Sequence, residues 1–251
     1  SRGPTWRIST CEGANIFCIS ERIDLRSYFS SVSLLKRIVR REPMSMELYP
    51  QGKPFMEDAE IKPYRPEPKV IFLDQREFDV FKSDSGEGSI YIAFDGDGDR
   101  AACWVKKSGQ VVELSPNDLG VLYGWYLHKT GGTTDATHVN KTLPSSRGLA
   151  MLAIWAYKKL VVTPVGSKHF ADQMYDSSSE KALVATEESG HHGGRIGKHT
   201  WFDDATCQGM LMLEIMATSG KDLVDNISQA RADIKFVGWV FKRTNIELTD
   251  E

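Results

Sequence analysis

The sequence predicts an α/β fold in which helices pack on mixed or mostly parallel β-sheets. Its 251 residues are enough for two compact domains of ~100 to 150 residues each. The stretch SIYIAF has the β-branched and aromatic content of a buried strand. In the second half of the chain, strand-like runs alternate with amphipathic helical segments, and this alternation is typical of layered α/β domains.

In the first half, the clearest signals lie on either side of this strand. FLDQREFDVFKSDSGEG predicts a helix of about two to three turns, which Asp74 caps and the following glycines end. ACWVKKSGQVVEL predicts a hairpin that turns at Lys107–Gly109. The first ~20 residues show no clear period, and the prolines and charges of Pro50–Pro68 predict an extended loop. Between these segments the sequence predicts short strands over 23–29 and 44–50 and a helix over 33–40.

In the second half, SPNDLGVLYGWYLHKTGG predicts a helix, and three strand–helix pairs follow it. The strands are THVNKTL, LVVTPVG and KALVATEESG, and the helices are SSRGLAMLAIWAYKK, KHFADQMYDSS and FDDATCQGMLMLEIMATSG. Gly220 ends the last of these helices. The GGTTDAT segment predicts a linker between two domains, residues 1–130 and residues 131–251.

Four polar loops follow strand-like runs in this pattern. They are AFDGDGDR, VNKTLPSSR, VTPVGSKH and VATEESGHH. Ligands of open α/β sheets bind at the carboxyl ends of the strands. We therefore expect the four loops to converge on one crevice.

Three aspartates in the first of these loops predict a metal site. Asp95, Asp97 and Asp99 alternate with glycines, so in an extended strand their side chains would point the same way. A divalent cation removes the repulsion among three like charges, and oxygen-only ligands favour Mg²⁺, Ca²⁺ or Mn²⁺. Arg100 follows directly, and a guanidinium beside a hard cation suits a phosphate.

Two other kinds of metal site are not predicted. An EF-hand loop needs Gly at its sixth position and Glu at its twelfth, where this sequence has Arg100 and Lys106. The spacing of Cys207 and the three histidines before it matches no familiar set of zinc ligands. An acidic turn without any metal stays open as the alternative, since Asp-Gly pairs are common in turns.

The later loops carry candidate ligand-binding residues. Glu187, Ser189 and His191 stand at alternate positions next to glycines. A carboxylate, a hydroxyl and an imidazole together suit a polyhydroxylated ligand. Lys141 ends a strand, and a lysine whose pKa is lowered by burial can serve as a general acid or base. An ordinary surface lysine is the alternative at that position.

Three of these loops together resemble the signature loops of the α-D-phosphohexomutase superfamily, which includes phosphomannomutase/phosphoglucomutase and phosphoglucosamine mutase. They are DGDGDR (95–100), TPVGSKHF (163–170) and EESGH (187–191). The resemblance implies two consecutive α/β/α domains with mixed sheets, like the family's domains two and three. Residues 1–130 would then carry the metal loop, and residues 131–251 the sugar-binding loop. The family moves a phosphoryl group between the 1- and 6-positions of a hexose by way of a phosphoserine.

The resemblance also implies a role for each candidate residue. Asp95, Asp97 and Asp99 would hold Mg²⁺, and Arg100 would contact the phosphoserine or the sugar phosphate. The implied substrate-binding residues are Gly166, Lys168, Glu187 and Ser189, and the implied catalytic residues are Arg100, Lys141 and His191.

The resemblance is incomplete. Neither the family's Thr-Ala-Ser-His-Asn-Pro type of phosphoserine loop nor its Arg-x-Ser-Gly-Thr-Glu-Pro type of phosphate clamp occurs in this sequence. The chain would therefore be part of a full mutase, a non-catalytic structural subunit of a larger assembly, or a chain whose partner supplies the missing domains. We expect the isolated chain to bind Mg²⁺ and hexose phosphate without turnover. A Mg²⁺-dependent phosphatase that uses an Asp-x-Asp nucleophile is a further alternative.

Composition limits the other partners. The chain has 31 Lys+Arg against 34 Asp+Glu, so it lacks the basic excess that nucleic-acid binding needs. No apolar run reaches the ~20 residues of a membrane helix. The four cysteines form no CxxC pair, which favours reduced thiols in an intracellular, cytoplasmic protein, with an organelle as the alternative. The expected partners are hexose phosphate and further subunits or domains.

Overall fold

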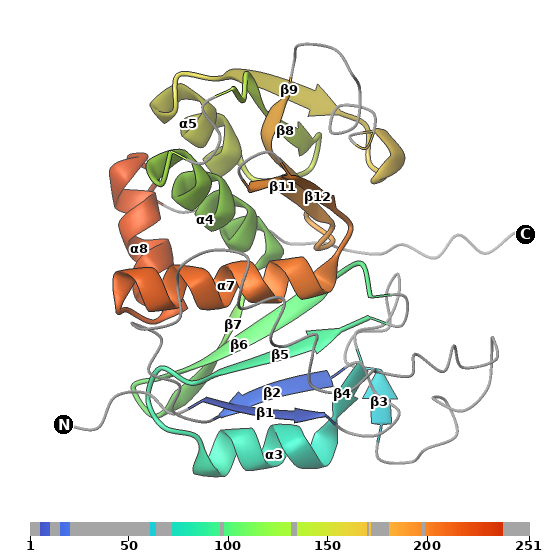
Figure 1. The fold of residues 1–251 in the computed structure, drawn as a ribbon, viewed down its shortest axis with the longest axis vertical. Coiled ribbons are helices and arrows are strands. Elements are labelled where there is room, and N and C mark those ends of the chain that lie inside the picture. The colour runs from blue at the N-terminus through green and yellow to red at the C-terminus, as the bar shows by residue number, and fades with distance from the viewer. Residues whose placement is uncertain are drawn as a thin grey trace, which may run out of the picture. The chain divides into compact units, whose positions relative to one another are not determined.

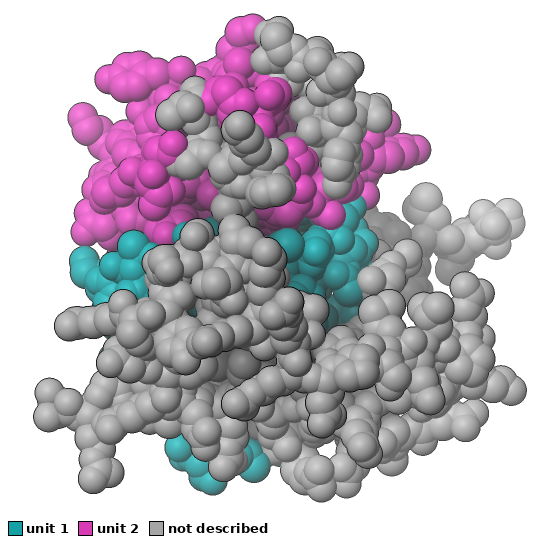
Figure 2. All heavy atoms as spheres, in the orientation of Figure 1, with its two compact units in different colours: residues 1–115, 190–192, 203–226 teal, residues 116–189, 193–202, 227–251 magenta. Residues whose placement is uncertain are grey.

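In a computed structural model, the protein forms two compact units (Figure 2). Unit 1 contains residues 1–115, 190–192 and 203–226, and unit 2 contains residues 116–189, 193–202 and 227–251. The structure describes residues 6–10, 16–20, 61–63, 72–95, 98–131, 135–169, 171, 181–196 and 199–237.

Unit 1 is built on a five-stranded sheet (Figure 1). The strand order is β1 (Trp6–Thr10), β2 (Ile16–Ser20), β5 (Ile90–Phe94), β6 (Ala101–Lys107) and β7 (Gln110–Leu114). All four neighbouring pairs are antiparallel. The predicted hairpin is confirmed, because Ser108 and Gly109 have φ values of 51° and 75°. Two left-handed residues in a two-residue turn match the twist of the flanking strands.

Helices cover both faces of this sheet, as alternating side chains require. On one face, α3 (Gln75–Asp84) brings Phe78 and Phe81 against Tyr91 and Trp104. The Phe78 ring centroid lies 5.2 Å from the centroids of the Tyr91 and Trp104 rings. Both pairs are edge-to-face, an arrangement that aromatic pairs favour. On the other face, α7 (Ala205–Ser219) packs its Gly209 next to the strand β5. Figure 1 shows α3 and α7 on opposite sides of the sheet, so the α/β/α layering is confirmed in unit 1.

Unit 2 contains a second five-stranded sheet, which is mixed. The strand order is β12 (His199–Phe202), β11 (His192–Ile196), β10 (Ala182–Thr186), β8 (His138–Thr142) and β9 (Lys159–Thr163). β8 pairs parallel with both β10 and β9, whereas β11 and β12 form an antiparallel pair. β8 and β10 are buried at every position, as expected of parallel strands covered on both faces.

Helices α4 (Pro116–Lys129) and α5 (Arg147–Trp155) pack on this sheet. Ser146 caps α5, since its side chain accepts a hydrogen bond from the Gly148 N–H. Two glycines of α4 allow close packing: a Cβ at Gly120 would lie 2.7 Å from Thr186, and one at Gly124 would lie 2.4 Å from Leu152. Small residues on α4 therefore set the distance between this helix and β10.

The substitution Gly124→Ala is expected to lower the free energy of unfolding. The new methyl group would meet Leu152 at 2.4 Å and Val184 at 2.8 Å, and both neighbours are fully buried. Overpacking costs about 1–3 kcal/mol, and at two fully buried neighbours we expect this cost to exceed the gain of about 1 kcal/mol in helix propensity. Gly209→Ala in α7 is the matched control, because its nearest contact would be an ordinary 3.5 Å. Urea denaturation of both variants measures the difference, and equal stabilities would contradict the packing account.

Most predicted elements are confirmed, and one is corrected. Within the predicted loop Pro50–Pro68, residues Ile61–Pro63 form strand β3, which pairs with β4 (Phe72–Asp74). A proline is tolerated there because Pro63 stands at the end of a short strand. Gly220 ends α7 in a left-handed conformation, as predicted. The predicted elements at 23–29, 33–40 and 44–50 and most of the predicted helix KHFADQMYDSS lie outside the described residues.

The sequence reading missed strands β1, β2, β11 and β12 and helix α8 (Leu223–Asp233). Helix α8 packs on α4 through an ion pair of 2.6 Å between Arg231 and Asp118. The two compact units interleave along the chain. The predicted domain boundary after residue 130 stays a prediction. In the described part of the chain, every helix is too short or too polar to cross a membrane.

Candidate sugar and metal site

Three polar loops of unit 2 meet at the carboxyl ends of its parallel strands. The Leu143 N–H donates a hydrogen bond of 2.9 Å to the Thr163 carbonyl, which joins the loops after β8 and β9. The Glu188 carboxylate accepts hydrogen bonds from Thr142 (2.9 Å) and Ser145 (3.3 Å), which joins the loops after β8 and β10. Parallel strands bring their carboxyl ends to one edge, so three of the four predicted loops come together.

Glu187 lies at the centre of these loops, and its carboxylate is held at both oxygens. The Gly166 N–H donates to Oε1 at 2.7 Å, and the Ser189 hydroxyl donates to Oε2 at 2.7 Å. Glu187 is only 3% exposed. Gly166 has a φ of 119°, a left-handed value that glycine adopts without strain. Three of the four predicted substrate-binding residues therefore touch one another, and Lys168 is exposed in the same loop as Gly166.

Lys141 is the second-to-last residue of β8 and is 7% exposed. Its ammonium group donates hydrogen bonds to the carbonyls of Thr142 (2.8 Å) and Leu143 (3.1 Å). Burial lowers the pKa of Lys141, because desolvation disfavours the charged form, while the nearby Glu188 carboxylate raises it in part. Lys141 is thus not the surface lysine of the alternative interpretation.

The Asp-Gly loop of unit 1 folds back on itself between β5 and β6. Asp95 is 1% exposed and accepts hydrogen bonds of 3.1 Å from the N–H groups of Asp99 and Arg100. The Arg100 guanidinium donates to the other Asp95 oxygen at 2.5 Å, and Arg100 is 4% exposed. Gly98 has a φ of 75°, so the described end of the loop turns tightly and does not continue as an extended strand. Asp97 lies outside the described residues.

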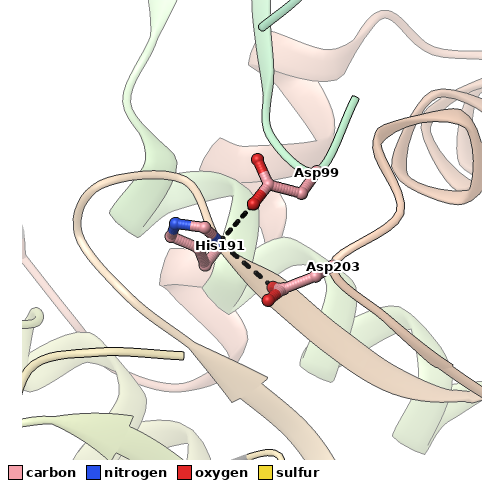
Figure 3. A group of neighbouring side chains, drawn as sticks. All are labelled: Asp99, His191 and Asp203. Carbon is pink, nitrogen blue, oxygen red and sulfur yellow. Dashed lines mark hydrogen bonds and ion pairs between the residues drawn. The ribbon is translucent and has the colours of Figure 1, made fainter. Parts of the chain in front are cut away.

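The third aspartate of the loop, Asp99, belongs to a separate cluster (Figure 3). His191 Nδ1 lies 3.5 Å from Asp99 Oδ2 and 3.1 Å from Asp203 Oδ1. Gln208, fully buried on α7, donates to the carbonyls of Asp99 (3.1 Å) and Gly190 (3.4 Å). Sequence reasoning missed Asp203 and Gln208. The pair of aspartates before α7 was the available signal for Asp203, whereas a lone Gln gave none.

Within unit 1, the backbones of His191 and Arg100 form an isolated antiparallel β-bridge. The end of the EESGH motif therefore contacts the Asp-Gly loop. Within unit 2, the beginning of the same motif contacts the loops after β8 and β9. The convergence of all four loops on one crevice stays a prediction, as do the metal triad and the catalytic roles.

Comparison with known proteins finds similarity to phosphohexomutases. Residues 115–232 match the family model described as phosphoglucomutase/phosphomannomutase, alpha/beta/alpha domain III. This segment of the chain is therefore similar to domain III of the phosphohexomutases. A phosphoglucosamine mutase of Solibacter usitatus is 31% identical over 144 residues, which are 57% of this chain and 29% of that protein. The resemblance noted from the three motifs is therefore confirmed.

One solved structure shares the fold of part of this chain. A structure assigned as a phosphomannomutase of Thermus thermophilus aligns with a TM-score of 0.54 at 22% identity, over 64% of this chain and 34% of that one. The chain thus spans about a third of the length of the phosphohexomutases that it matches. The prediction of layered α/β domains with a mixed sheet is confirmed by the fold and by this alignment.

Proposed function

We propose that the chain supplies the sugar-binding and metal-binding parts of a phosphohexomutase. In this proposal a phosphoryl group moves between the 1- and 6-positions of a hexose phosphate by way of a phosphoserine. The observation that carries the proposal is the buried Glu187 carboxylate. Gly166 and Ser189 hold it in place by hydrogen bonds where the loops after β8, β9 and β10 meet. The family match of residues 115–232 supports it.

Glu187 and Ser189 are proposed to bind sugar hydroxyls. A carboxylate offers about four lone-pair sites, and the hydrogen bonds within the loops use one on each oxygen of Glu187. A carboxylate and a hydroxyl are suitable partners for sugar hydroxyls, and both lie in the loop that follows β10. Because Glu187 is held before the ligand arrives, little conformational entropy is lost on binding.

Arg100 and the aspartates of the Asp-Gly loop are proposed to act at the phosphate. The donor set fits Mg²⁺, since the three aspartates offer only oxygen ligands and Asp95 has an acceptor site left beside its three hydrogen bonds. Asp95, Asp97 and Asp99 would hold the ion, which stabilises negative charge on a transferring phosphoryl group when it is bound. Arg100 is fixed by Asp95, so its guanidinium is oriented for a phosphate.

Lys141 and His191 are the proposed groups for proton transfer. The lowered pKa of Lys141 makes its ammonium group a better proton donor at neutral pH than an exposed lysine. Its hydrogen bonds to two carbonyls fix the ammonium group at the end of β8. His191 Nδ1 is held by Asp203, so the Nε2 atom is the one that would face a substrate proton.

The substitution Glu187→Gln is expected to weaken hexose phosphate binding by about 10- to 100-fold, since hydrogen bonds to charged groups are worth about 1.5–3 kcal/mol. Isothermal titration of the 251-residue chain with glucose 1-phosphate and glucosamine 6-phosphate measures this effect. Glu214→Gln on α7 is the matched control and should bind like the wild type. A melting curve of each variant shows that both remain folded.

Equal binding by Glu187→Gln and wild type would contradict the proposed role of Glu187. A wild-type chain that binds neither sugar phosphate at millimolar concentration would contradict the proposed function as a whole.

A further inference from the structure

Asp99, His191 and Asp203 come from three separate segments of unit 1 and point toward one another (Figure 3). Asp99 ends the Asp-Gly loop, His191 precedes β11, and Asp203 follows β12 and precedes α7. One ligand atom from each side chain lies within 4.8 Å of the other two. All three residues are partly exposed, so a small ion can reach them from solvent.

The distances between these atoms suit a shared metal ion. Two ligands that lie about 2.0–2.2 Å from Zn²⁺ at tetrahedral or right angles are about 2.8–3.6 Å apart. His191 Nδ1 is 3.1 Å from Asp203 Oδ1 and 3.5 Å from Asp99 Oδ2. The ligand atoms of Asp99 and Asp203 lie within 4.8 Å of each other, and both belong to carboxylates that can rotate toward a shared ion. The three side chains can therefore bind one cation while the backbone stays in place.

The surrounding contacts hold each member of the cluster. Gln208 fixes the Asp99 carbonyl, and the N–H of Ala205 donates to the Gly98 carbonyl at 2.9 Å. The Asp203 N–H donates to the His192 carbonyl at 3.1 Å, and Asp203 has a left-handed φ of 46°. These contacts fix the main-chain positions from which the Asp99 and Asp203 side chains reach the cluster.

We propose that Asp99, His191 and Asp203 form a binding site for a transition-metal dication such as Zn²⁺. An imidazole nitrogen with two carboxylates suits Zn²⁺ and its neighbours, whereas Mg²⁺ prefers oxygen ligands only. Three protein ligands also leave a coordination position open for water or a phosphate oxygen. The site differs in composition from the predicted aspartate triad, since Asp95 is bonded to Arg100 and only Asp99 is common to both.

One consequence concerns the proposed mutase function. A transition metal in this site uses both Asp99 and His191, so it removes one ligand from Mg²⁺ and one candidate group from proton transfer. Zinc binding would therefore oppose the metal-loaded state of the Asp-Gly loop. The zinc proposal itself does not rest on the mutase function, because metal binding is measured without any sugar phosphate.

The test is a titration of the purified 251-residue chain with Zn²⁺ by calorimetry and with Co²⁺ by visible absorption. Co²⁺ reports a bound nitrogen ligand through its d–d spectrum, so the readout does not depend on activity. The variants Asp203→Asn and His191→Gln each remove one ligand, and asparagine tolerates the left-handed backbone at position 203. Asp97→Asn removes a residue of the predicted triad alone, and His169→Gln removes a histidine outside the cluster.

The proposal expects one Zn²⁺ per chain, with affinity at least tenfold lower in Asp203→Asn and His191→Gln and unchanged in Asp97→Asn and His169→Gln. Absence of stoichiometric Zn²⁺ or Co²⁺ binding to the wild-type chain would overturn it. An equal loss in Asp97→Asn and Asp203→Asn would also overturn it, since the ion would then occupy the aspartate loop. Two ligand variants are used so that the test still holds if one of them does not fold. Thermal melts of the metal-free variants show whether each is folded.

Discussion

Replacement of Arg100 by Met is expected to lower the free energy of unfolding by about 3–5 kcal/mol, the usual cost of breaking a buried ion pair. Arg100 is 4% exposed and Asp95 is 1% exposed, and the Nε–Oδ2 distance is 2.5 Å. Without the guanidinium, the Asp95 carboxylate keeps two backbone N–H donors but loses the cation that is bonded to it. Urea denaturation of the two proteins measures the effect.

A double-mutant cycle separates the ion pair from other effects of the substitution. Asp95→Asn removes the charge that Arg100→Met would leave uncompensated, so the double variant should be more stable than the sum of the single effects predicts. The matched control is the exposed pair Lys82–Asp79, whose atoms also lie 2.5 Å apart. Lys82→Met should cost less than about 1 kcal/mol. Strictly additive effects at Asp95 and Arg100 would contradict the account.

The ion pair also explains why the Asp-Gly loop was only partly predictable. The alternation of aspartates indicated an extended strand in which Asp95 and Asp99 share a face. Instead, Asp95 turns inward to bond the N–H groups of Asp99 and Arg100, and Gly98 provides the left-handed turn. A carboxylate that satisfies nearby backbone donors stabilises a tight turn. The pattern of side chains in the sequence does not distinguish this turn from a strand.

The fold was predictable where burial imposes a period on the sequence. SIYIAF gives β5, in which every residue is buried, and the run ending in Gly220 gives α7. β11 and β12 were missed because glycines replace apolar residues along β11, where Gly193 and Gly194 lie against Phe202 and Trp201. Close packing of aromatic rings on a glycine-rich strand leaves no apolar period in that strand.

The residues of the candidate site also differed in whether the sequence pattern could predict them. Glu187, Ser189 and His191 were predictable because they are polar residues at alternate positions directly after a buried strand. Asp203 was not, because it lies 12 residues from His191 and the antiparallel pairing of β11 with β12 brings the two together. The adjacent Asp204 caps α7, since its side chain accepts a hydrogen bond from the Cys207 N–H. The pair of aspartates in the sequence therefore indicates a helix start. Long-range pairing of strands is the information that the sequence pattern lacks.

Stability is expected to fall by about 1.4 kcal/mol per pH unit as the pH drops below ~6.5, because of His192. His192 is fully buried at the start of β11, and burial, with a smaller contribution from His191, lowers its pKa to about 3. The unfolded chain binds a proton at this histidine below pH ~6.5, whereas the folded chain does not until about pH 3. Above pH ~6.5 neither state is protonated, so the contribution vanishes there.

The variant His192→Phe isolates this contribution, since it keeps an aromatic ring and removes the titratable nitrogens. Burial also lowers the pKa of His128, and carboxylates titrate at lower pH, so the difference between the two proteins is the informative quantity. Urea denaturation at about pH 7.5 and 5.0 should show a decrease in wild-type stability that exceeds that of the variant by about 2 kcal/mol. Parallel pH dependence in the two proteins would mean that His192 is protonated in the folded chain. Such a result would contradict the account in which burial keeps the imidazole neutral in the folded chain.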